Sequence, residues 1–141
     1  MATAEWPEEL LEIVEDFSAA FDTSERYDML FELADAVDEL PISEWTPSTK
    51  VHGCQSEAHV LACLNEDGSF HLRGAADSRL VQGLISITAI ALEGLSLAEV
   101  ADFSPTFVEE MGLKEALSPS RANGFLNMFK KVQQGAVLLE E

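Results

Sequence analysis

The sequence predicts an α+β domain in which a small antiparallel sheet of about three strands packs against several helices. Apolar residues recur at helical spacing in the first third and in the last half of the chain, and they alternate at strand spacing over residues 57–64. The 141 residues fit a single domain, 1–141. A domain of this length buries enough surface to fold without a metal or a disulfide.

Two helices are predicted before the sheet. Pro7 suits the first turn of the first helix, and a capping pair, Asp22 with Glu25, opens the second. We expect the second helix to end at Leu40, because the residue before Pro41 is disfavoured in helical geometry. The apolar stripes are Leu10, Ile13, Val14, Phe17 and Phe21 in the first helix, and Tyr27, Leu30, Phe31, Ala34 and Val37 in the second.

A β-hairpin is predicted in the middle of the chain. Residues 57–64 place Ala58, Val60, Ala62 and Leu64 on one face of a strand. Residues 65–68 form the turn, and residues 69–73 form the returning strand. A short strand at residues 49–51 is expected to precede the hairpin.

Four helices are predicted after the hairpin, each with a start or a stop signal. These signals are Asp77 or Ser78 as a cap and Gly94 as a stop, the capping box of Ser96 and Glu99, Pro105 with Gly112, and Pro119 after Ser118.

The charge balance limits the possible functions. Eight Lys and Arg stand against 26 Asp and Glu, which gives a net charge of −18. Such a surface repels phosphates and anionic lipids, so we expect neither nucleic acid nor membrane as a partner. Because the acids are spread along the chain, they favour a role in solubility, as in a salt-rich cytoplasm, over a negative face that steers a basic partner.

The sequence predicts a cytoplasmic protein with free thiols. The first 15 residues contain five glutamates, the opposite of a basic signal-peptide start. The apolar stretch from Leu80 to Leu92 is shorter than the roughly 20 residues that span a bilayer. In a reducing compartment, Cys54 and Cys63 stay unpaired.

Cys54 lies in a polar loop, residues 51–56, between two predicted strands. Gly53 allows a tight turn before it, and a thiol in such a loop can be shielded at rest and exposed when a partner docks. The alternative is a structural cysteine that fills a small pocket, since free cysteine is among the most buried residue types.

Four segments resemble motifs of the SufE family of sulfur acceptors. Residues 50–56 (K-V-H-G-C-Q-S) are similar to the family signature, which reads roughly V-P-G-C-Q-S. Residues 26–30 resemble its R-Y-x-x-L helix, residues 77–85 its D-x-x-I-V-x-G-L-I helix start, and residues 118–124 its S-P-S-R-x-N-G turn. The matches occur in family order and extend from Arg26 to the C-terminal part of the chain.

The resemblance implies a SufE/IscU-like fold and an accessory role in sulfur transfer, without a cofactor or a metal. Cys54 would take persulfide sulfur from a SufS-like cysteine desulfurase, stimulate that enzyme, and pass the sulfur to a SufB-like iron–sulfur scaffold. The transfer is an exchange of the thiol–disulfide type. The remaining site residues implied, in the loop or facing the partner, are His52, Gly53, Gln55, Ser56, Asp77 and Arg121.

The chain departs from the family pattern at two places. His52 stands where the family has proline, and Ala58-His59 stand where it has valine-tryptophan. Both departures indicate a divergent partner surface.

Other uses of these residues stay open. Cys54 could act as the nucleophile of a thiol-dependent enzyme with His52 or His59 as base. Zinc could be held by His52, Cys54, His59 and Cys63, although their spacing matches no familiar zinc knuckle. An acidic interaction module without chemistry is a third possibility. Cys63, on a strand beside Leu61, is expected to pack rather than react.

Overall fold

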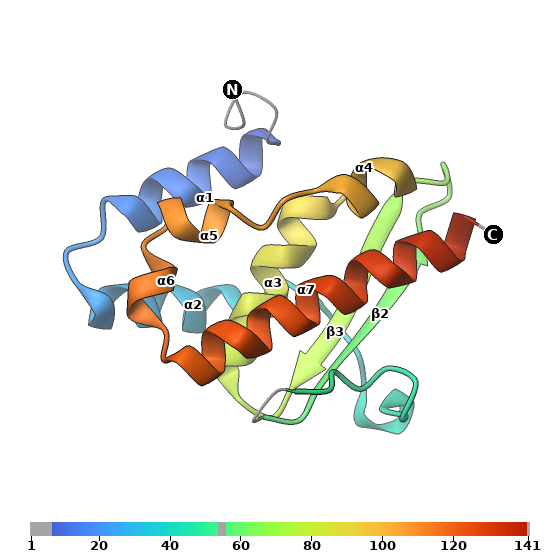
Figure 1. Cartoon of the computed structure of the whole chain (residues 1–141), viewed down its shortest axis with the longest axis horizontal. Helices are drawn as coiled ribbons and strands as arrows, with labels where there is room; N and C mark the ends of the chain where they lie inside the picture. The colour runs from blue at the N-terminus through green and yellow to red at the C-terminus, as the bar shows by residue number, and fades with distance from the viewer. Residues whose placement is uncertain (1–6, 54–55, 141) are drawn as a thin grey trace.

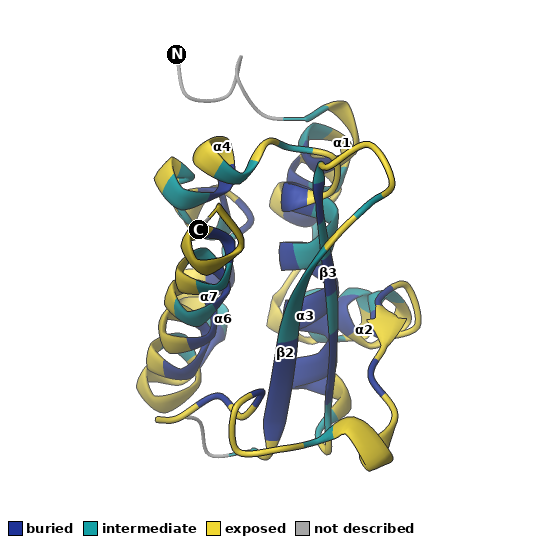
Figure 2. Cartoon of the chain, turned by 90° about the vertical axis from the view of Figure 1, so that its right-hand side faces the viewer, coloured by how far each residue is buried: buried dark blue, intermediate teal, exposed yellow. Residues whose placement is uncertain are grey.

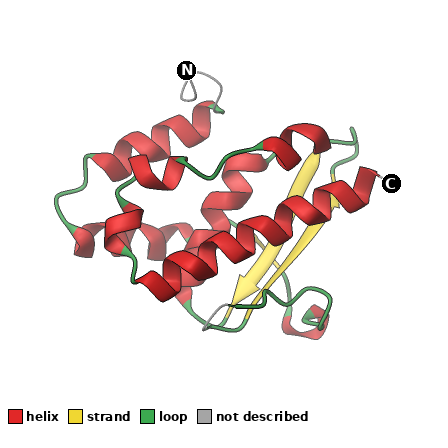
Figure 3. Cartoon of the chain, in the orientation of Figure 1, coloured by secondary structure: helices red, strands yellow, loops and turns green. Residues whose placement is uncertain are grey.

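The computed structural model describes residues 7–53 and 56–140 and has the predicted α+β architecture (Figure 1). A three-stranded sheet lies at one side of the molecule, with helices packed against it (Figures 1 and 3). The elements in chain order are α1 (Glu8–Ser18), α2 (Thr23–Leu33), β1 (Asp38–Glu39), the 3-10 helix η2 (Ile42–Glu44), β2 (Ala58–Leu64), β3 (Phe70–Ala76), α3 (Arg79–Leu92), α4 (Leu97–Asp102), α5 (Phe107–Glu110), α6 (Leu113–Ala116) and α7 (Pro119–Glu140).

The sheet has the strand order β1-β3-β2 and is mixed. β2 and β3 form the predicted antiparallel hairpin, with Ala62 opposite Leu72, whereas β1 pairs with β3 in parallel. The prediction of a purely antiparallel sheet is therefore wrong for one strand. The expected strand at residues 49–51 makes only a single bridge, Lys50 opposite His59, because the Thr49 N–H turns back to the carbonyl of Thr46.

Helices α3 and α7 cover the face of the hairpin that carries the alternating apolar residues. Figure 2 shows buried residues on the inner sides of α3, β2 and β3 and exposed residues on the outer turns of α7. Gly135 of α7 lies so close to β2 that an added Cβ would sit 2.9 Å from the Cβ of Ala62. The opposite sheet face carries His59 and His71 and is partly covered by the segment that contains η2.

The two N-terminal helices are shorter than their apolar patterns predicted. α1 ends at Ser18, and Phe21 is 91% exposed rather than part of a buried stripe. α2 ends at Leu33, not Leu40, because the chain leaves the helix to form β1, and the Leu40 N–H then donates to the Gly74 carbonyl. The pairing with β3 therefore overrides the helical pattern that runs through Val37.

The later helices follow their predicted signals. Ser78, not Asp77, accepts the capping bond of α3, and the capping box of Ser96 and Glu99 opens α4. α7 begins at Pro119 as predicted. The short helix α6 directly after Gly112 is an addition, since the sequence indicated only a helix end there.

The R-Y motif of α2 holds the α5–α6 region in place. The Arg26 Nε–H donates to the carbonyl of Met111 at 2.9 Å, and the Tyr27 hydroxyl donates to the carbonyl of Ala116 at 2.7 Å. This motif therefore has a structural explanation in the packing of α2 against α5 and α6. None of the helices described is both long enough and apolar enough to cross a bilayer.

Candidate functional site

The loop at residues 52–56 is anchored on both sides by backbone hydrogen bonds to β2. The Val51 N–H donates to the Ala58 carbonyl at 2.8 Å, and the Val60 N–H donates to the Thr49 carbonyl at 2.9 Å. Cys54 and Gln55 lie outside the described residues, between Gly53 and Ser56. These bonds therefore fix the backbone up to Val51 before the cysteine and from Ala58 after it.

The side chain of His59 links a residue before the loop, Thr49, to a residue after it, Glu57. Its side chain is only 2% exposed, and its ring stacks on Trp45 with centroids 4.7 Å apart. Nδ1 lies 2.7 Å from the Thr49 hydroxyl, before the loop, and Nε2 lies 3.0 Å from the Glu57 carboxylate, after it. Because a carboxylate only accepts, Nε2 carries the proton in the neutral ring and Nδ1 accepts from Thr49. The hydrogen bond from His59 lowers the pKa of Glu57.

Asp77 fixes the second side of the loop to the start of α3. Its carboxylate accepts from the Glu57 N–H at 3.1 Å, and its own N–H donates to the Glu57 carbonyl at 3.0 Å. Asp77 was expected in the loop or facing the partner, and this pair of bonds places it directly beside the loop as an anchor.

Gly53 sits in a conformation that requires glycine. Its φ is +82°, in the left-handed region. An added Cβ would lie against the Asn127 amide, which donates a hydrogen bond to the Gly53 carbonyl at 3.3 Å. α7 therefore contacts the loop backbone one residue before the cysteine.

A small cavity lies beside the loop, where β2, α3 and the start of α7 meet. Its volume is about 20 Å³, enough for one water-sized group. The walls are mainly apolar, and they are formed by Ser56, Ala58, Val81, Leu84, Ser120, Arg121, Gly124, Phe125 and Met128.

Arg121 brings a positive charge to this cavity. Its side chain is exposed, and its guanidinium makes no ion pair with any described carboxylate. Two other arginines in the described part of the chain are paired, Arg73 with Asp38 and Glu44, and Arg79 with Asp35. His52 is also exposed. Arg121 therefore has its charge available at this site.

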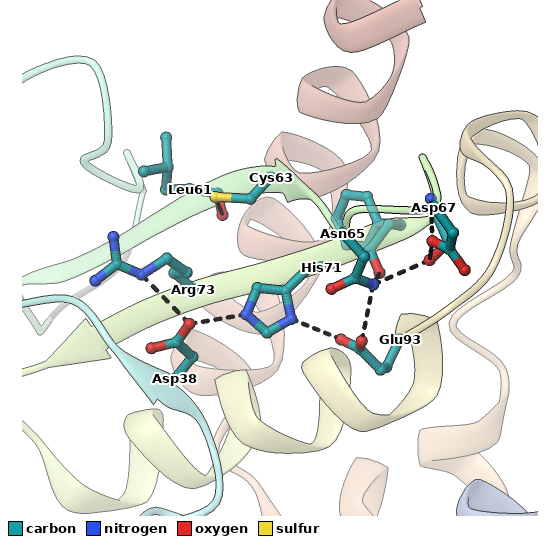
Figure 4. Close-up of polar contacts among 10 residues, drawn as sticks. Asp38, Leu61, Cys63, Asn65, Asp67, His71, Arg73 and Glu93 are labelled. Atoms are coloured by element: carbon teal, nitrogen blue, oxygen red, sulfur yellow. Dashed lines mark hydrogen bonds and ion pairs between the residues drawn. The ribbon is translucent and has the colours of Figure 1, made fainter.

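Cys63 lies near the other end of β2, in a different environment. Partial burial raises the pKa of its thiol above the usual range, and its Sγ contacts the carbonyl of Leu61 at 3.7 Å. Figure 4 shows the thiol beside a polar cluster in which His71 lies between Asp38 and Glu93, 2.8 Å from each. A thiol with a raised pKa is mostly protonated near neutral pH and is a weak nucleophile.

The surroundings of His59 disfavour the zinc site that the sequence left open. Within residues 7–53 and 56–140, no group of three or more His, Cys, Asp and Glu is arranged to hold a metal ion. Both ring nitrogens of His59 already have partners inside the protein, so a metal would have to displace Thr49 or Glu57. For the same reason His59 is poorly suited to act as a base for a thiol.

Five predicted residues meet at this end of β2: His52, Gly53, Ser56, Asp77 and Arg121. The sequence did not single out Asn127 or Met128. Helical spacing from Arg121 was the available signal for Met128, because positions 121, 124 and 128 share one stripe of a helix. The roles of Trp45 and Thr49 had no sequence signal, since both depend on the course of the preceding loop.

The described residues thus give a sheet covered by helices on one face, with Gly53 and Ser56 fixed on either side of the cysteine position by contacts to α7 and α3. Residues 11–136 match the family model of the SufE Fe-S metabolism associated domain. The chain is 36% identical over 140 residues to an uncharacterized SufE-like protein of Synechocystis, covering 99% of this chain and 87% of that protein.

A second curated protein with a SufE-like name and one solved structure with a similar fold also match the chain. SufE-like protein 1, chloroplastic/mitochondrial, of Arabidopsis thaliana is 34% identical over 136 residues, or 96% of this chain; the chain spans only 37% of that protein's length. The solution structure of a hypothetical protein from Thermus thermophilus has a TM-score of 0.77 at 25% identity, and the match covers 95% of this chain and 97% of that protein.

These matches define the class as sulfur-transfer proteins of iron–sulfur metabolism, which implies a cysteine desulfurase as a partner. The chain belongs to the SufE family.

Proposed function

We propose that Cys54 accepts sulfur from the persulfide of a SufS-like cysteine desulfurase and carries it to a SufB-like iron–sulfur scaffold in the cytoplasm. The Cys54 thiolate attacks the outer sulfur of the desulfurase persulfide. A new S–S bond forms on Cys54, the S–S bond of the donor breaks, and the donor cysteine leaves as a thiolate. No external oxidant or reductant is needed, because one S–S bond replaces another.

The observation that carries the proposal is that the described ends of the loop lie beside a small cavity lined by Arg121, which forms no ion pair with a described carboxylate. The bonds of Thr49, Val51, Glu57 and Asp77 hold the sides of the loop, so the two ends of the segment that contains Cys54 are fixed in space. A cation near a thiol lowers its pKa and favours the thiolate that the exchange requires. Arg121 is the cation at this cavity.

Cys63 is the less suitable acceptor. Its raised pKa lowers the thiolate fraction, and its position beside the His71 cluster is at the far end of β2 from the loop. We therefore assign the sulfur to Cys54 and treat the protein as an accessory carrier without a cofactor rather than as a free-standing enzyme. Removal of the persulfide product would stimulate the desulfurase.

The test is intact mass spectrometry after incubation with the desulfurase and free cysteine. The wild-type chain is expected to gain one sulfur that a reductant removes. Cys54→Ser should gain none and should no longer stimulate the desulfurase, whereas Cys63→Ser should retain most of both activities. Circular dichroism of both variants would show whether the fold is intact. Loss of activity in Cys63→Ser alone would contradict the assignment.

A further inference from the structure

The outer edge of β2 is open over its second half. In an antiparallel strand, alternate residues direct their N–H and C=O groups to opposite neighbours. Val60 donates to Thr49 and Ala58 accepts from Val51 on this outer edge, so Ala62 and Leu64 direct their backbone groups the same way. No described residue is hydrogen-bonded to these outward groups of Ala62 and Leu64. An open edge of this kind pairs readily with an extended segment of another chain.

An apolar groove runs beside this edge. It lies between β2, the preceding loop and the C-terminal half of α7, and it has a volume of about 340 Å³. At Gly135 the helix is close to Ala62, and beyond it the side chain of Leu138 remains 68% exposed. Leu64, at the end of the strand, is also exposed. The groove can therefore receive apolar side chains of a strand that pairs with β2.

The walls of the groove are free of acidic residues. Asp and Glu number 26 in the chain, yet none occurs in residues 45–56, 58–64 or 116–139, which supply all three walls. Residues 116–139 instead contain three of the eight cations, Arg121, Lys130 and Lys131. The acids are thus not spread evenly, and the groove suits a neutral or acidic segment.

Lys131 places a positive charge in the groove itself. It lines the wall, and its Nζ donates to the carbonyl of Ser48 at 2.9 Å, a neutral acceptor that leaves its charge uncompensated. No described carboxylate forms an ion pair with it. A carboxylate on a segment that pairs with β2 could form an ion pair with the Lys131 ammonium group.

The groove is continuous with the loop that carries Cys54. Along α7, Arg121 and Gly124 line the small cavity, Asn127 contacts Gly53, and Lys131 contacts Ser48 at the mouth of the groove. Figure 1 shows α7 lying across the sheet, and α7 contacts β2. A partner that contacts Gly53 and Ser56, on either side of the cysteine position, is therefore close to this surface.

We propose that an extended, acidic segment of the cysteine desulfurase pairs with the outer edge of β2 and inserts apolar side chains between β2 and α7. The inference rests on the proposed function, because it takes the desulfurase as the partner at the Cys54 loop. Only an extended backbone satisfies the outward groups of Ala62 and Leu64. A second copy of the chain fits less well, since two molecules of charge −18 repel each other and each would bring its own Lys131 to the contact.

The test compares opposite charges at one exposed position. Leu138→Glu and Leu138→Lys both remove the leucine, but only the first adds a negative charge to the groove. Binding to the desulfurase, with its nucleophilic cysteine replaced by serine, is measured by isothermal titration calorimetry. We expect Leu138→Glu to weaken binding at least about tenfold and Leu138→Lys to weaken it less than about threefold. Leu126→Glu is the matched control, because it makes the same change at an exposed leucine of α7 outside the groove and should bind like wild type.

A second measurement tests the strand pairing directly. Hydrogen exchange at the amides of Ala62 and Leu64 is expected to slow when the desulfurase is added. Ala62→Pro, which removes an outward N–H and none of the N–H or C=O groups that bond to β3, should weaken binding. Unchanged exchange at both amides would overturn strand pairing even if Ala62→Pro failed to fold.

The outcomes separate the two proposals. If wild type does not bind the desulfurase, the proposed function fails and this inference fails with it. If wild type binds but Leu138→Glu and Leu138→Lys bind equally well, only the inference fails. A wild-type dimer in sedimentation that Leu138→Glu converts to monomers would show that a second copy occupies the groove, and would also overturn it.

Discussion

Two histidines lie at opposite ends of the same face of the β2–β3 hairpin, and their surroundings differ. His59, beside the Cys54 loop, is buried, stacks on Trp45 and bonds to Thr49 and Glu57. His71, at the far end, is half-buried between Asp38 and Glu93 (Figure 4). The buried network fixes the geometry of a loop, whereas the charged cluster joins β1, β3 and the end of α3 at the surface, where water and salt weaken ion pairs.

The largest effect is expected from His59→Ala. The change removes a buried ring, leaves a cavity beside Trp45 and removes one partner of the Thr49 hydroxyl, which keeps its bonds to the Thr46 backbone. We expect a loss of about 2–4 kcal/mol in the free energy of unfolding. Urea denaturation measures this loss, and sulfur uptake under conditions where the variant is folded should also be slower. If His71→Ala lowers the free energy of unfolding as much as His59→Ala does, the contrast between the two ends of the hairpin is wrong.

A smaller loss of stability is expected from Gly53→Val. The left-handed backbone at this position disfavours a β-branched residue, and the new side chain would displace Asn127. We expect about 1–2 kcal/mol of destabilisation and a larger relative loss in the rate of sulfur uptake, because the strain falls next to Cys54. Asn127→Ala is the control, since it removes the contact without changing the backbone. Wild-type stability and uptake in Gly53→Val would show that the left-handed turn is dispensable.

The smallest effect, and one that depends on pH, is expected from His71→Gln. Hydrogen bonds with Asp38 and then with Glu93 raise the pKa of His71, and the bond from His71 lowers the pKa of Asp38. Protonated His71 therefore stabilises the fold fully below its unfolded-state pKa of about 6.5, and this contribution is lost as pH rises through the raised folded value. The contribution of Asp38 is present above its unfolded-state pKa of about 3.9 and is lost as pH falls.

The difference in unfolding free energy between wild type and His71→Gln should consequently be largest at about pH 5–6 and shrink toward pH 8. Its size is expected to stay below about 1 kcal/mol, because the cluster is partly exposed. Added salt should reduce it further. Urea denaturation across this pH range is the measurement, and a difference that grew with pH would have the wrong sign.

The comparison also shows what a sequence pattern can and cannot predict. The hairpin, the capping box at Ser96 and the start of α7 at Pro119 were predicted because their signals lie within a few residues of one another. The length of α2 was not predicted correctly. Residues 38–39 form a strand instead of continuing the helix, and their partner strand β3 is more than 30 residues away in the sequence. His59 was considered as a base or a zinc ligand, and the structure gives it a structural role because Thr49 and Trp45 come to it from a loop without a pattern.

The sequence by itself determined the α+β class, the family motifs and the cysteine between glycine and glutamine, since these depend on residue types and short spacings. Tertiary structure decided that Arg26 and Tyr27 serve the α5–α6 region, that Asp77 anchors the loop, and that Arg121 lines a cavity beside it. It also brought three separate acid-free segments together along one edge of the sheet. The physical reason is that local signals act through neighbouring backbone groups, whereas a site is formed by contacts between segments whose separation in the sequence carries no signal.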